Sequence, residues 1–268
     1  MEISAKVVMD LRKRTGLGMM ECKEALTATS GDMDAAVAYL REKLGKKMEV
    51  RSDRAATEGA IAIAQTPASV VLVALSAESD FAAKNDTFIH AAQTIANMAL
   101  QQPDGDITLT DEMKRLVDDL RITIKENISF LRGVKLSGEK AGGYVHHNRK
   151  IAAAVVGKGP LSDDLISGIA QHVTAAVPPL MTAAVSVDAS GVKPDEVAQQ
   201  RDAFTQEAAA SGKPPQIAEK MAQGKLQKWI DERTLLGQPY VKDMENSKPI
   251  RDHLPKGAAI TGFQRFSL

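Results

Sequence analysis

Apolar residues near the start of the chain recur at helical spacing in three short runs. The first run has Val8 and Leu11 on one face, with Ser4 placed to cap it and Gly16 placed to end it. Two further runs follow on either side of a break at residues 31–32, and their apolar positions share one helix face each: Met19, Cys22, Leu26, Met33, Val37, Leu40 and Leu44. The pattern predicts a small module of three helices over residues 1–45.

Charged residues replace this periodicity over residues 46–57. We interpret the segment as a linker, and the sequence leaves open whether it is mobile or helical. It separates the helical module from a region whose apolar runs are typical of strands.

The middle of the chain contains one order of elements twice. Residues 59–99 indicate a strand, a proline-marked turn, a strand, a loop and a helix, and residues 142–177 indicate the same series with a polar turn. After the first unit come a helix that Thr110 can cap and a strand over residues 128–136. Because a hairpin with one apolar face needs a helix to cover it, the repeat predicts two related α+β subdomains.

Residues 194–230 change character again, since two stretches rich in alanine, glutamine and charge are interrupted by "SGKPP". Glycine and proline stop a helix, so this pattern predicts an antiparallel helical hairpin that projects from the body. The core is then divided into one subdomain over residues 58–138 and a second over residues 139–193 and 231–268, which ends on a strand. The predicted fold class is α+β, with a three-helix module, two core subdomains and the hairpin.

Composition and charge limit the kinds of partner. The 34 basic residues equal the 34 acidic ones, so no net charge directs the chain to nucleic acid. No apolar run approaches the roughly 20 residues that span a bilayer, and the first residues lack the apolar core of a signal peptide. The single cysteine, Cys22, excludes an intramolecular disulfide and suits a reducing compartment. We expect a soluble cytoplasmic protein without a membrane or nucleic-acid partner.

Motifs of covalent chemistry are missing from the sequence. It contains no Walker phosphate loop, no dinucleotide-binding glycine motif and no nucleophile elbow. Cys22 lies on the inner face of its helix, which is typical of a packed thiol. His146 and His147 are adjacent, and neighbours on a strand point to opposite faces, so we do not expect them to share a metal ion. We therefore expect a protein that is not an enzyme, has no metal or cofactor and functions by contact.

An acid and an aromatic residue, Asp80 and Phe81, stand where the chain turns from a strand into a helix. One interpretation is that Asp80 caps the helix and Phe81 packs back into the core, and these residues by themselves favour it. The other is that Phe81 faces outward and contacts a partner. A basic run at residues 12–14 also allows two interpretations, because it can stabilise the end of the first helix or, through Arg12 and its neighbours, dock an acidic partner.

Several longer motifs resemble the signature segments of the translation elongation factor Ts family. They run in order along nearly the entire chain: "LRKRTGLGMMECKEAL" (11–26), "SDFAAKNDTF" (79–88), "KENISFLR" (125–132), "SGKPPQIAEKMAQGKLQKW" (211–229) and "LLGQPYV" (235–241). The first motif is long and specific. The family fold implies a ubiquitin-associated-like (UBA-like) three-helix module, a two-part core and a helical hairpin, in agreement with the pattern of breaks and periodicities above.

The resemblance also implies a function. The family consists of guanine-nucleotide exchange factors for elongation factor Tu, the GTPase that delivers aminoacyl-tRNA to the ribosome. Its N-terminal module is expected to dock on the nucleotide-binding domain of this partner, while the core is expected to bind that domain and another domain of the same partner. Asp80 and Phe81 match the tip of the first core subdomain, whose aromatic ring is expected to wedge in near the Mg²⁺ site, disturb Mg²⁺ and the phosphate loop, and release GDP. The factor itself then binds no nucleotide directly, and homodimerisation stays open.

Other residues match family positions at the interface with the partner. Lys23 in the first motif and His146 in "YVHH" are two of them, and Arg12 belongs to the basic run. The family's "IGENI" is "IKENI" here, so Ile124 is kept, while Lys125 replaces a glycine that helps close packing against the partner. An alternative function is a non-catalytic adaptor that binds its partner through the UBA-like module, and the family motifs outside that module disfavour it.

Overall fold

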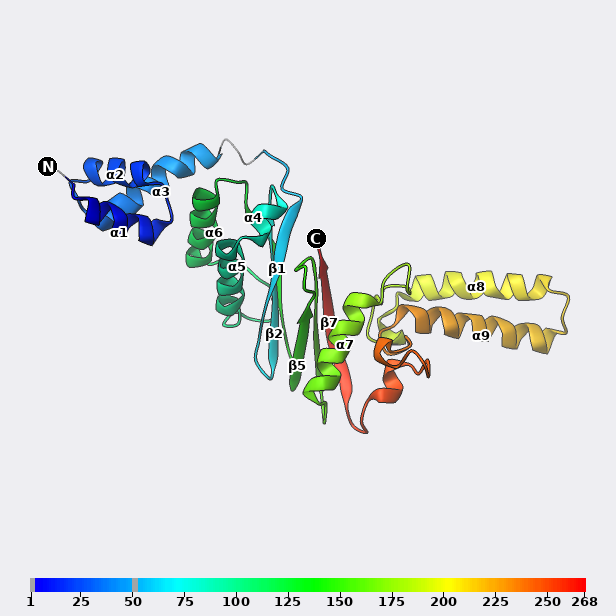
Figure 1. The fold of residues 1–268 in the computed structure, drawn as a ribbon. Helices are drawn as coiled ribbons and strands as arrows, with labels where there is room; N and C mark the ends of the chain where they lie inside the picture. The colour runs from blue at the N-terminus through cyan, green and yellow to red at the C-terminus, as the bar shows by residue number, and fades with distance from the viewer. Residues whose placement is uncertain (1–2, 50–52) are drawn as a thin grey trace.

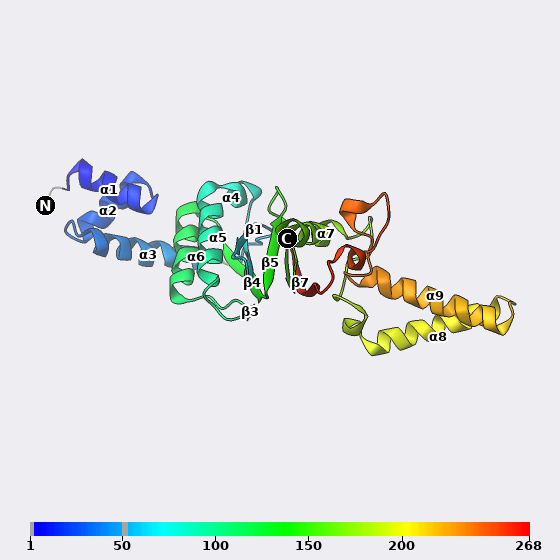
Figure 2. The same ribbon diagram turned by 90° about the horizontal axis from the view of Figure 1, so that it is seen from below.

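Four parts follow one another along an elongated molecule, as Figures 1 and 2 show. The computed structural model describes residues 3–49 and 53–268. The N-terminal helices lie at one end, two sheets with their helices form the middle, and a long helical hairpin projects at the other end. The predicted α+β class, with N-terminal helices, two core sheets and a projecting hairpin, is confirmed.

The N-terminal module contains, within residues 3–49, the helices α1 (Ala5–Thr15), α2 (Met19–Ala28) and α3 (Met33–Glu49). Its core consists of the apolar faces that the periodicity predicts, and the fully buried members include Leu11, Cys22 and Leu26. The hydroxyl of Ser4 accepts a hydrogen bond from the N–H of Val7 at 3.4 Å, and Gly16 adopts the left-handed conformation (φ 70°) that ends α1.

Helix α3 continues past residue 45, so the first part of the predicted linker belongs to a helix. An ion pair of 2.9 Å between Lys46 and Glu42, one helical turn apart, supports this extension. Residues 50–52 of the predicted linker lie outside the described residues. Residues 46–49 of the predicted linker are therefore helical, and residues 53–57 are not.

Subdomain N contains a four-stranded antiparallel sheet in the order β1-β2-β4-β3. Its strands are β1 (Glu58–Gln65), β2 (Ser69–Ala77), β3 (Gly105–Asp106) and β4 (Ser129–Ser137). One face packs against α5 (Asp86–Ala99) and α6 (Asp111–Ile124), while the short α4 (Asp80–Lys84) lies directly after β2. The core between sheet and helices includes Val73, Leu75, Phe88, Ile95 and Met113.

Subdomain C contains a three-stranded antiparallel sheet in the order β5-β6-β7, with α7 on its outer face. The elements are β5 (Lys140–Val145), β6 (Ile151–Lys158), α7 (Asp163–Ala175) and β7 (Ala259–Ser267). The two sheets pack face to face through a separate apolar cluster that includes Ile61, Leu72, Ala152, Ala154 and Phe266. Strand β2 is buried along almost its whole length because one of its faces contacts α5 and the other contacts the second sheet.

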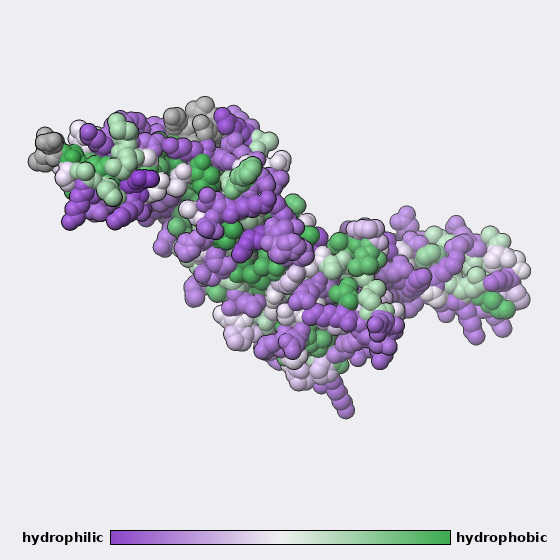
Figure 3. Space-filling view, in the orientation of Figure 1, coloured by the Kyte–Doolittle hydropathy of each residue, from purple (hydrophilic) through white to green (hydrophobic). Residues whose placement is uncertain are grey.

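The hairpin consists of α8 (Pro194–Ala210) and α9 (Pro215–Arg233), which run antiparallel. Its small apolar core is built from Ala208, Ala218 and Ala222 with the half-buried Phe204. Short 3₁₀ helices at Ala189–Gly191, Val241–Asp243 and Ile250–His253 lie in the segments around α8 and α9. Figure 3 shows a mainly polar visible face, on which apolar residues form small separate areas.

Helix α6 belongs to subdomain N and also packs against the N-terminal module. Its residue Ile122 belongs to the apolar cluster of the N-terminal module, not to that of subdomain N. The guanidinium of Arg41 in α3 donates two hydrogen bonds of 2.7 Å to the carboxylate of Asp119 in α6. The hydroxyl of Thr123 also donates to the carbonyl of Thr15 at 3.3 Å. These contacts hold the module against subdomain N.

A buried histidine joins α7 to the segment that returns from the hairpin. The N–H of Val241 lies 3.3 Å from Nδ1 of His172, so Nδ1 is the acceptor, and Nε2 donates to the side-chain carbonyl of Gln238 at 2.9 Å. The amide nitrogen of Gln238 in turn donates to the carbonyls of Thr182 and Glu232. Burial lowers the pKa of His172 below its ordinary value, and the hydrogen bond to Gln238 opposes this shift.

We expect the free energy of unfolding to fall as the pH drops below about 6.5, the ordinary histidine pKa. The folded-state pKa of His172 is depressed, so below this pH the unfolded chain binds a proton that the folded chain does not. The free energy of unfolding then falls by up to about 1.4 kcal/mol for each pH unit. Urea unfolding of wild type and His172→Asn between pH 8 and pH 5 measures this difference. The variant should show a smaller slope than wild type below pH 6.5, and equal slopes in the two proteins contradict the prediction.

Within the described ranges, no helix combines the length and the apolar character that crossing a bilayer requires.

Candidate partner-binding site

The turn between β2 and α4 places Asp80 and Phe81 in the first turn of a short helix. Ser79 has an extended backbone (φ −124°, ψ 156°), and its hydroxyl accepts a hydrogen bond from the N–H of Ala82 at 3.2 Å. Ser79 is therefore the cap, and the interpretation of Asp80 as the cap is wrong. Asp80 lies one residue later, where the positive end of the helix dipole favours a carboxylate.

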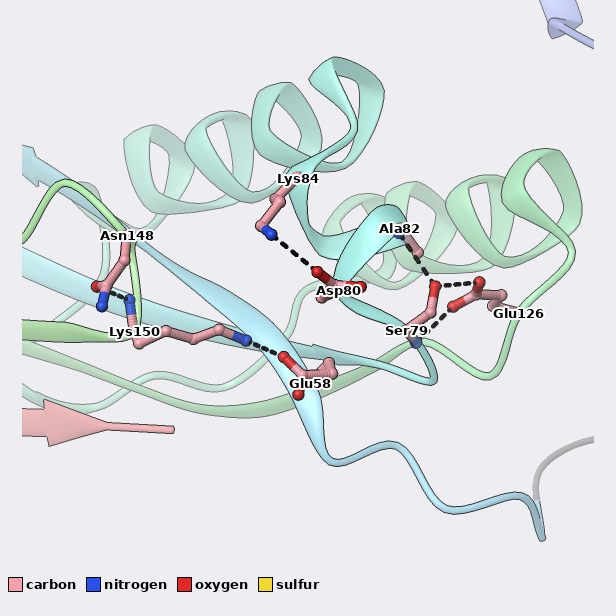
Figure 4. A network of polar contacts seen from close by, with 8 residues as sticks. All are labelled: Glu58, Ser79, Asp80, Ala82, Lys84, Glu126, Asn148 and Lys150. Carbon is pink, nitrogen blue, oxygen red and sulfur yellow. Dashed lines mark hydrogen bonds and ion pairs between the residues drawn. The ribbon is translucent and has the colours of Figure 1, made fainter.

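Asp80 is paired within its own helix. Its carboxylate lies 2.8 Å from Nζ of Lys84, one turn further along α4 (Figure 4). The hydrogen bond from Lys84 lowers the pKa of Asp80 below its ordinary value, so the carboxylate carries its charge at neutral pH. Both side chains are exposed, and the pair is a weak contributor to stability.

Phe81 points away from the core, with 84% of its surface exposed. It is the most exposed large apolar side chain among residues 3–46 and 53–268, whose burial the structure describes. Successive helix residues are rotated by about 100°, so the burial of Ala82 and Ala83 turns Phe81 to the opposite side. The expectation of a Phe81 packed into the core is thus wrong, and the core position is taken by Phe88 in α5.

The turn between β5 and β6 lies at the same end of the sheets as α4. Nζ of Lys150 forms an ion pair with Glu58 at the start of β1, and Asn148 accepts a hydrogen bond from the N–H of Lys150 at 2.9 Å (Figure 4). The carbonyl of Arg149 also accepts from the N–H of Ile61 in β1 at 2.8 Å. The structure therefore brings a turn of subdomain C next to the strand that borders α4.

His146 is the first residue of this turn, since β5 ends at Val145. Nδ1 of His146 lies 3.1 Å from the hydroxyl of Tyr144, and the His146 and His147 rings are 4.2 Å apart between centroids. The prediction that the two rings point to opposite faces is wrong, because both residues lie in a turn rather than in a strand. Across the described ranges, no group of three or more His, Cys, Asp or Glu side chains could hold a metal ion.

Ile124 and Lys125 lie at the end of α6. Ile124 is half-buried and packs against the core of subdomain N. Lys125 has a left-handed backbone (φ 65°), and its N–H donates to the carbonyl of Arg121 at 2.8 Å, which ends the helix. Glycine adopts this conformation without the cost that a side chain adds. The glycine of the family pattern thus has a conformational reason at this position, in addition to any packing against a partner.

Lys125 also contacts the N-terminal module. Its Nζ lies 3.0 Å from the carboxylate of Glu21 in α2. Arg12 in the last turn of α1 and Lys23 in α2 are both exposed on the same module. The structure therefore places two of the predicted contact residues on the N-terminal module and the others on the core. No single cluster contains all of them.

Comparison with known proteins identifies the family. A family model described as "Elongation factor TS" matches residues 78–268. A protein named elongation factor Ts from Psychrobacter cryohalolentis is 36% identical over 276 residues, which cover 100% of this chain and 90% of that protein. Proteins of the same name from Methylococcus capsulatus and Alkalilimnicola ehrlichii are 36% and 39% identical, and each alignment covers 100% of this chain and 92% of the relative. The chain belongs to the elongation factor Ts family.

The match to the elongation factor Ts family includes the candidate site and extends beyond it. The matched segment begins at Glu78, one residue before the cap of α4, and contains the hairpin and subdomain C. Alignments over the whole chain also include the N-terminal module with Arg12 and Lys23. The roles of Asp80, Phe81 and the other contact residues in binding a partner stay predictions.

Proposed function

We propose that this member of the elongation factor Ts family is a guanine-nucleotide exchange factor that binds elongation factor Tu with bound GDP and accelerates the release of GDP. It acts in the cytoplasm, in the elongation phase of translation. Family membership supports the role and the partner. The observation that carries the mechanism is the exposed ring of Phe81 on a capped helix, with Ala82 and Ala83 packed beneath it.

The mechanism is mechanical rather than covalent. Bound GDP is held by Mg²⁺ and by backbone N–H groups of the phosphate-binding loop of a GTPase. The Phe81 ring enters between side chains near the Mg²⁺ site, and Asp80 accompanies it with a negative charge. Displacement of these side chains weakens the coordination of Mg²⁺ and the cradle around the phosphates. Since no bond is made or broken in this protein, it is an exchange factor and not an enzyme in the covalent sense.

The binding energy for this displacement comes from contacts away from α4. Arg12 and Lys23 contribute from the N-terminal module, Ile124 and Lys125 from the end of α6, and His146 from the β5–β6 turn. Linkage requires that GDP weakens binding of the factor by the same ratio as the factor weakens binding of GDP. Either guanine nucleotide can therefore displace the factor from the GTPase, and the factor can act on many GTPase molecules in turn.

Small amounts of this protein should accelerate the release of fluorescently labelled GDP from elongation factor Tu. Stopped-flow measurements with increasing factor give a release rate that rises to a plateau, and the plateau is the rate within the complex. An unchanged release rate with folded factor contradicts the proposal. The adaptor alternative predicts binding to the partner without any change in release, so a binding measurement on the same samples separates the two functions.

A further inference from the structure

Two acidic side chains, Glu78 and Glu126, join the turn before α4 to the turn after α6 by hydrogen bonds. The carboxylate of Glu126 accepts two hydrogen bonds from Ser79, one from its N–H at 3.0 Å and one from its hydroxyl at 2.6 Å (Figure 4). In the opposite direction, the carboxylate of Glu78 accepts from the N–H of Asn127 at 2.6 Å. Residues 78–79 and 126–127 are thus joined by three hydrogen bonds in which the acceptor is a charged carboxylate, the strong class of such bonds.

The contact with Glu126 fixes which way the hydroxyl of Ser79 points. A serine hydroxyl has one proton and two lone pairs. Because the proton is donated to Glu126, the oxygen presents its lone pairs to the N–H of Ala82, which is the bond that caps α4. A hydroxyl that donates to a charged acceptor also becomes a better acceptor itself. Glu126 therefore strengthens the cap of α4 and sets its direction.

Helix α4 depends on this cap more than a longer helix would. It has five residues, and a helix this short is not stable in isolation. Its buried side chains are the small Ala82 and Ala83, which bury little apolar area. Its far end passes into α5 at Asn85, whose side chain accepts from the N–H of Thr87 at 2.8 Å. The near end, which carries Phe81, is held at Ser79.

The backbone around Glu126 is held in place by its neighbours. Lys125 closes α6 just before it, and the fully buried Ile128 follows two residues later. Asn127, between them, is buried and donates a side-chain hydrogen bond to the carbonyl of Arg54 at 2.7 Å. The backbone at residue 126 is therefore held on both sides. The Glu126 side chain, which extends from this fixed backbone to Ser79, can therefore fix the position of α4 relative to the sheet.

We propose that Glu126 is a positioning residue for nucleotide exchange, which holds Ser79 so that α4 presents Phe81 at a fixed place and angle. The inference rests on the proposed function, because it assigns Phe81 the active contact. Glu126 does not touch the nucleotide or the Mg²⁺ of the partner. Its effect is on the fraction of complexes in which the Phe81 ring is correctly placed, and therefore on the release rate within the complex.

The test compares Glu126→Gln with wild type. The amide keeps the size of the side chain but has one acceptor oxygen where the carboxylate has two. It can accept from the N–H or from the hydroxyl of Ser79, not from both, so the hydroxyl loses the charged acceptor that sets its direction. We expect the plateau of GDP release to fall about tenfold, the loss of one hydrogen bond to a charged group. The factor concentration at half-maximal release should change less than about threefold, because the other contacts remain.

Control variants separate positioning from general damage. Asp111→Asn removes an exposed carboxylate at the start of α6 and should leave both parameters unchanged. Ser79→Thr keeps the hydroxyl and should retain most of the plateau, whereas Ser79→Ala should lower it and add little to Glu126→Gln in the double variant. An unchanged plateau in Glu126→Gln, or a loss seen only as weaker binding, overturns the inference.

Hydrogen exchange of the free protein tests the same inference without the partner. The amides of Ala82 and Ala83, which are hydrogen-bonded to Ser79, should exchange faster in Glu126→Gln, while amides in β2 and α5 keep their wild-type rates. If wild type does not accelerate GDP release, the proposed function fails, and the exchange rates still report whether Glu126 orders α4. Unchanged exchange at Ala82 and Ala83 overturns the positioning role in either case.

Discussion

The Phe81→Ala variant should slow GDP release within the complex with elongation factor Tu by about 30-fold, which corresponds to the ~2 kcal/mol that an aromatic anchor contributes at an interface. The ring is 84% exposed in the free protein, so its removal exposes almost no core. We therefore expect the free energy of unfolding to change by no more than about 0.5 kcal/mol.

Two measurements on one preparation test this prediction. Stopped-flow release of fluorescent GDP gives the plateau rate, and urea unfolding gives the stability. Ile217→Ala is a matched control, since it removes another exposed apolar side chain, on the hairpin at the far end of the molecule (Figure 1). A large loss of stability in Phe81→Ala would mean that the ring packs against the core. An unchanged plateau would mean that the ring is not the active contact.

The Phe88→Ala variant should give the opposite result, with a loss of about 3–5 kcal/mol in the free energy of unfolding. Phe88 is seven positions further along the chain and has 0% of its surface exposed. It packs in the core of subdomain N, between α5 and the sheet. Removal of its ring leaves a cavity that the surrounding side chains fill only in part. Because the total free energy of unfolding of a globular protein is about 5–15 kcal/mol, this loss is a large share of the stability.

Urea unfolding followed by circular dichroism measures this loss. The variant Phe88→Leu keeps most of the apolar volume and should lose much less stability, which makes it the matched control. Under conditions where Phe88→Ala is still folded, its plateau of GDP release should stay close to wild type. A loss below about 1 kcal/mol would contradict the assignment of Phe88 to a tightly packed core.

Phe88 and Phe81 show which burial states a sequence pattern can predict and which it cannot. The spacing of Phe88 with Ala92, Ile95 and Ala99 predicts a buried helix face, and all four are buried in α5. No comparable period surrounds Phe81, because α4 is too short for one. From the residues alone, a buried Phe81 is the better interpretation, and it is wrong. Its exposure depends on which face of α4 meets the sheet, which is a property of the packed structure.

The same distinction holds for polar contacts. Breaks such as Gly16 and the residues around Pro214 predict the ends of helices, because they act through local backbone geometry. The hydrogen bonds between Glu126 and Ser79 join residues 47 positions apart, and no local rule connects them. Glu126 lies within the "KENISFLR" motif, yet the motif by itself assigns it no partner.

Local backbone chemistry and the period of apolar residues were enough to predict the N-terminal helices, the repeated order of strands and helix, and the hairpin broken at "SGKPP". The motifs of the sequence also identified the family. Three features became known from the folded chain alone: Ser79 caps α4, Phe81 is exposed, and the rings of His146 and His147 lie together. The two groups of features differ because helix propensity and apolar period act over a few residues, whereas burial and side-chain pairing depend on distant segments that folding brings together.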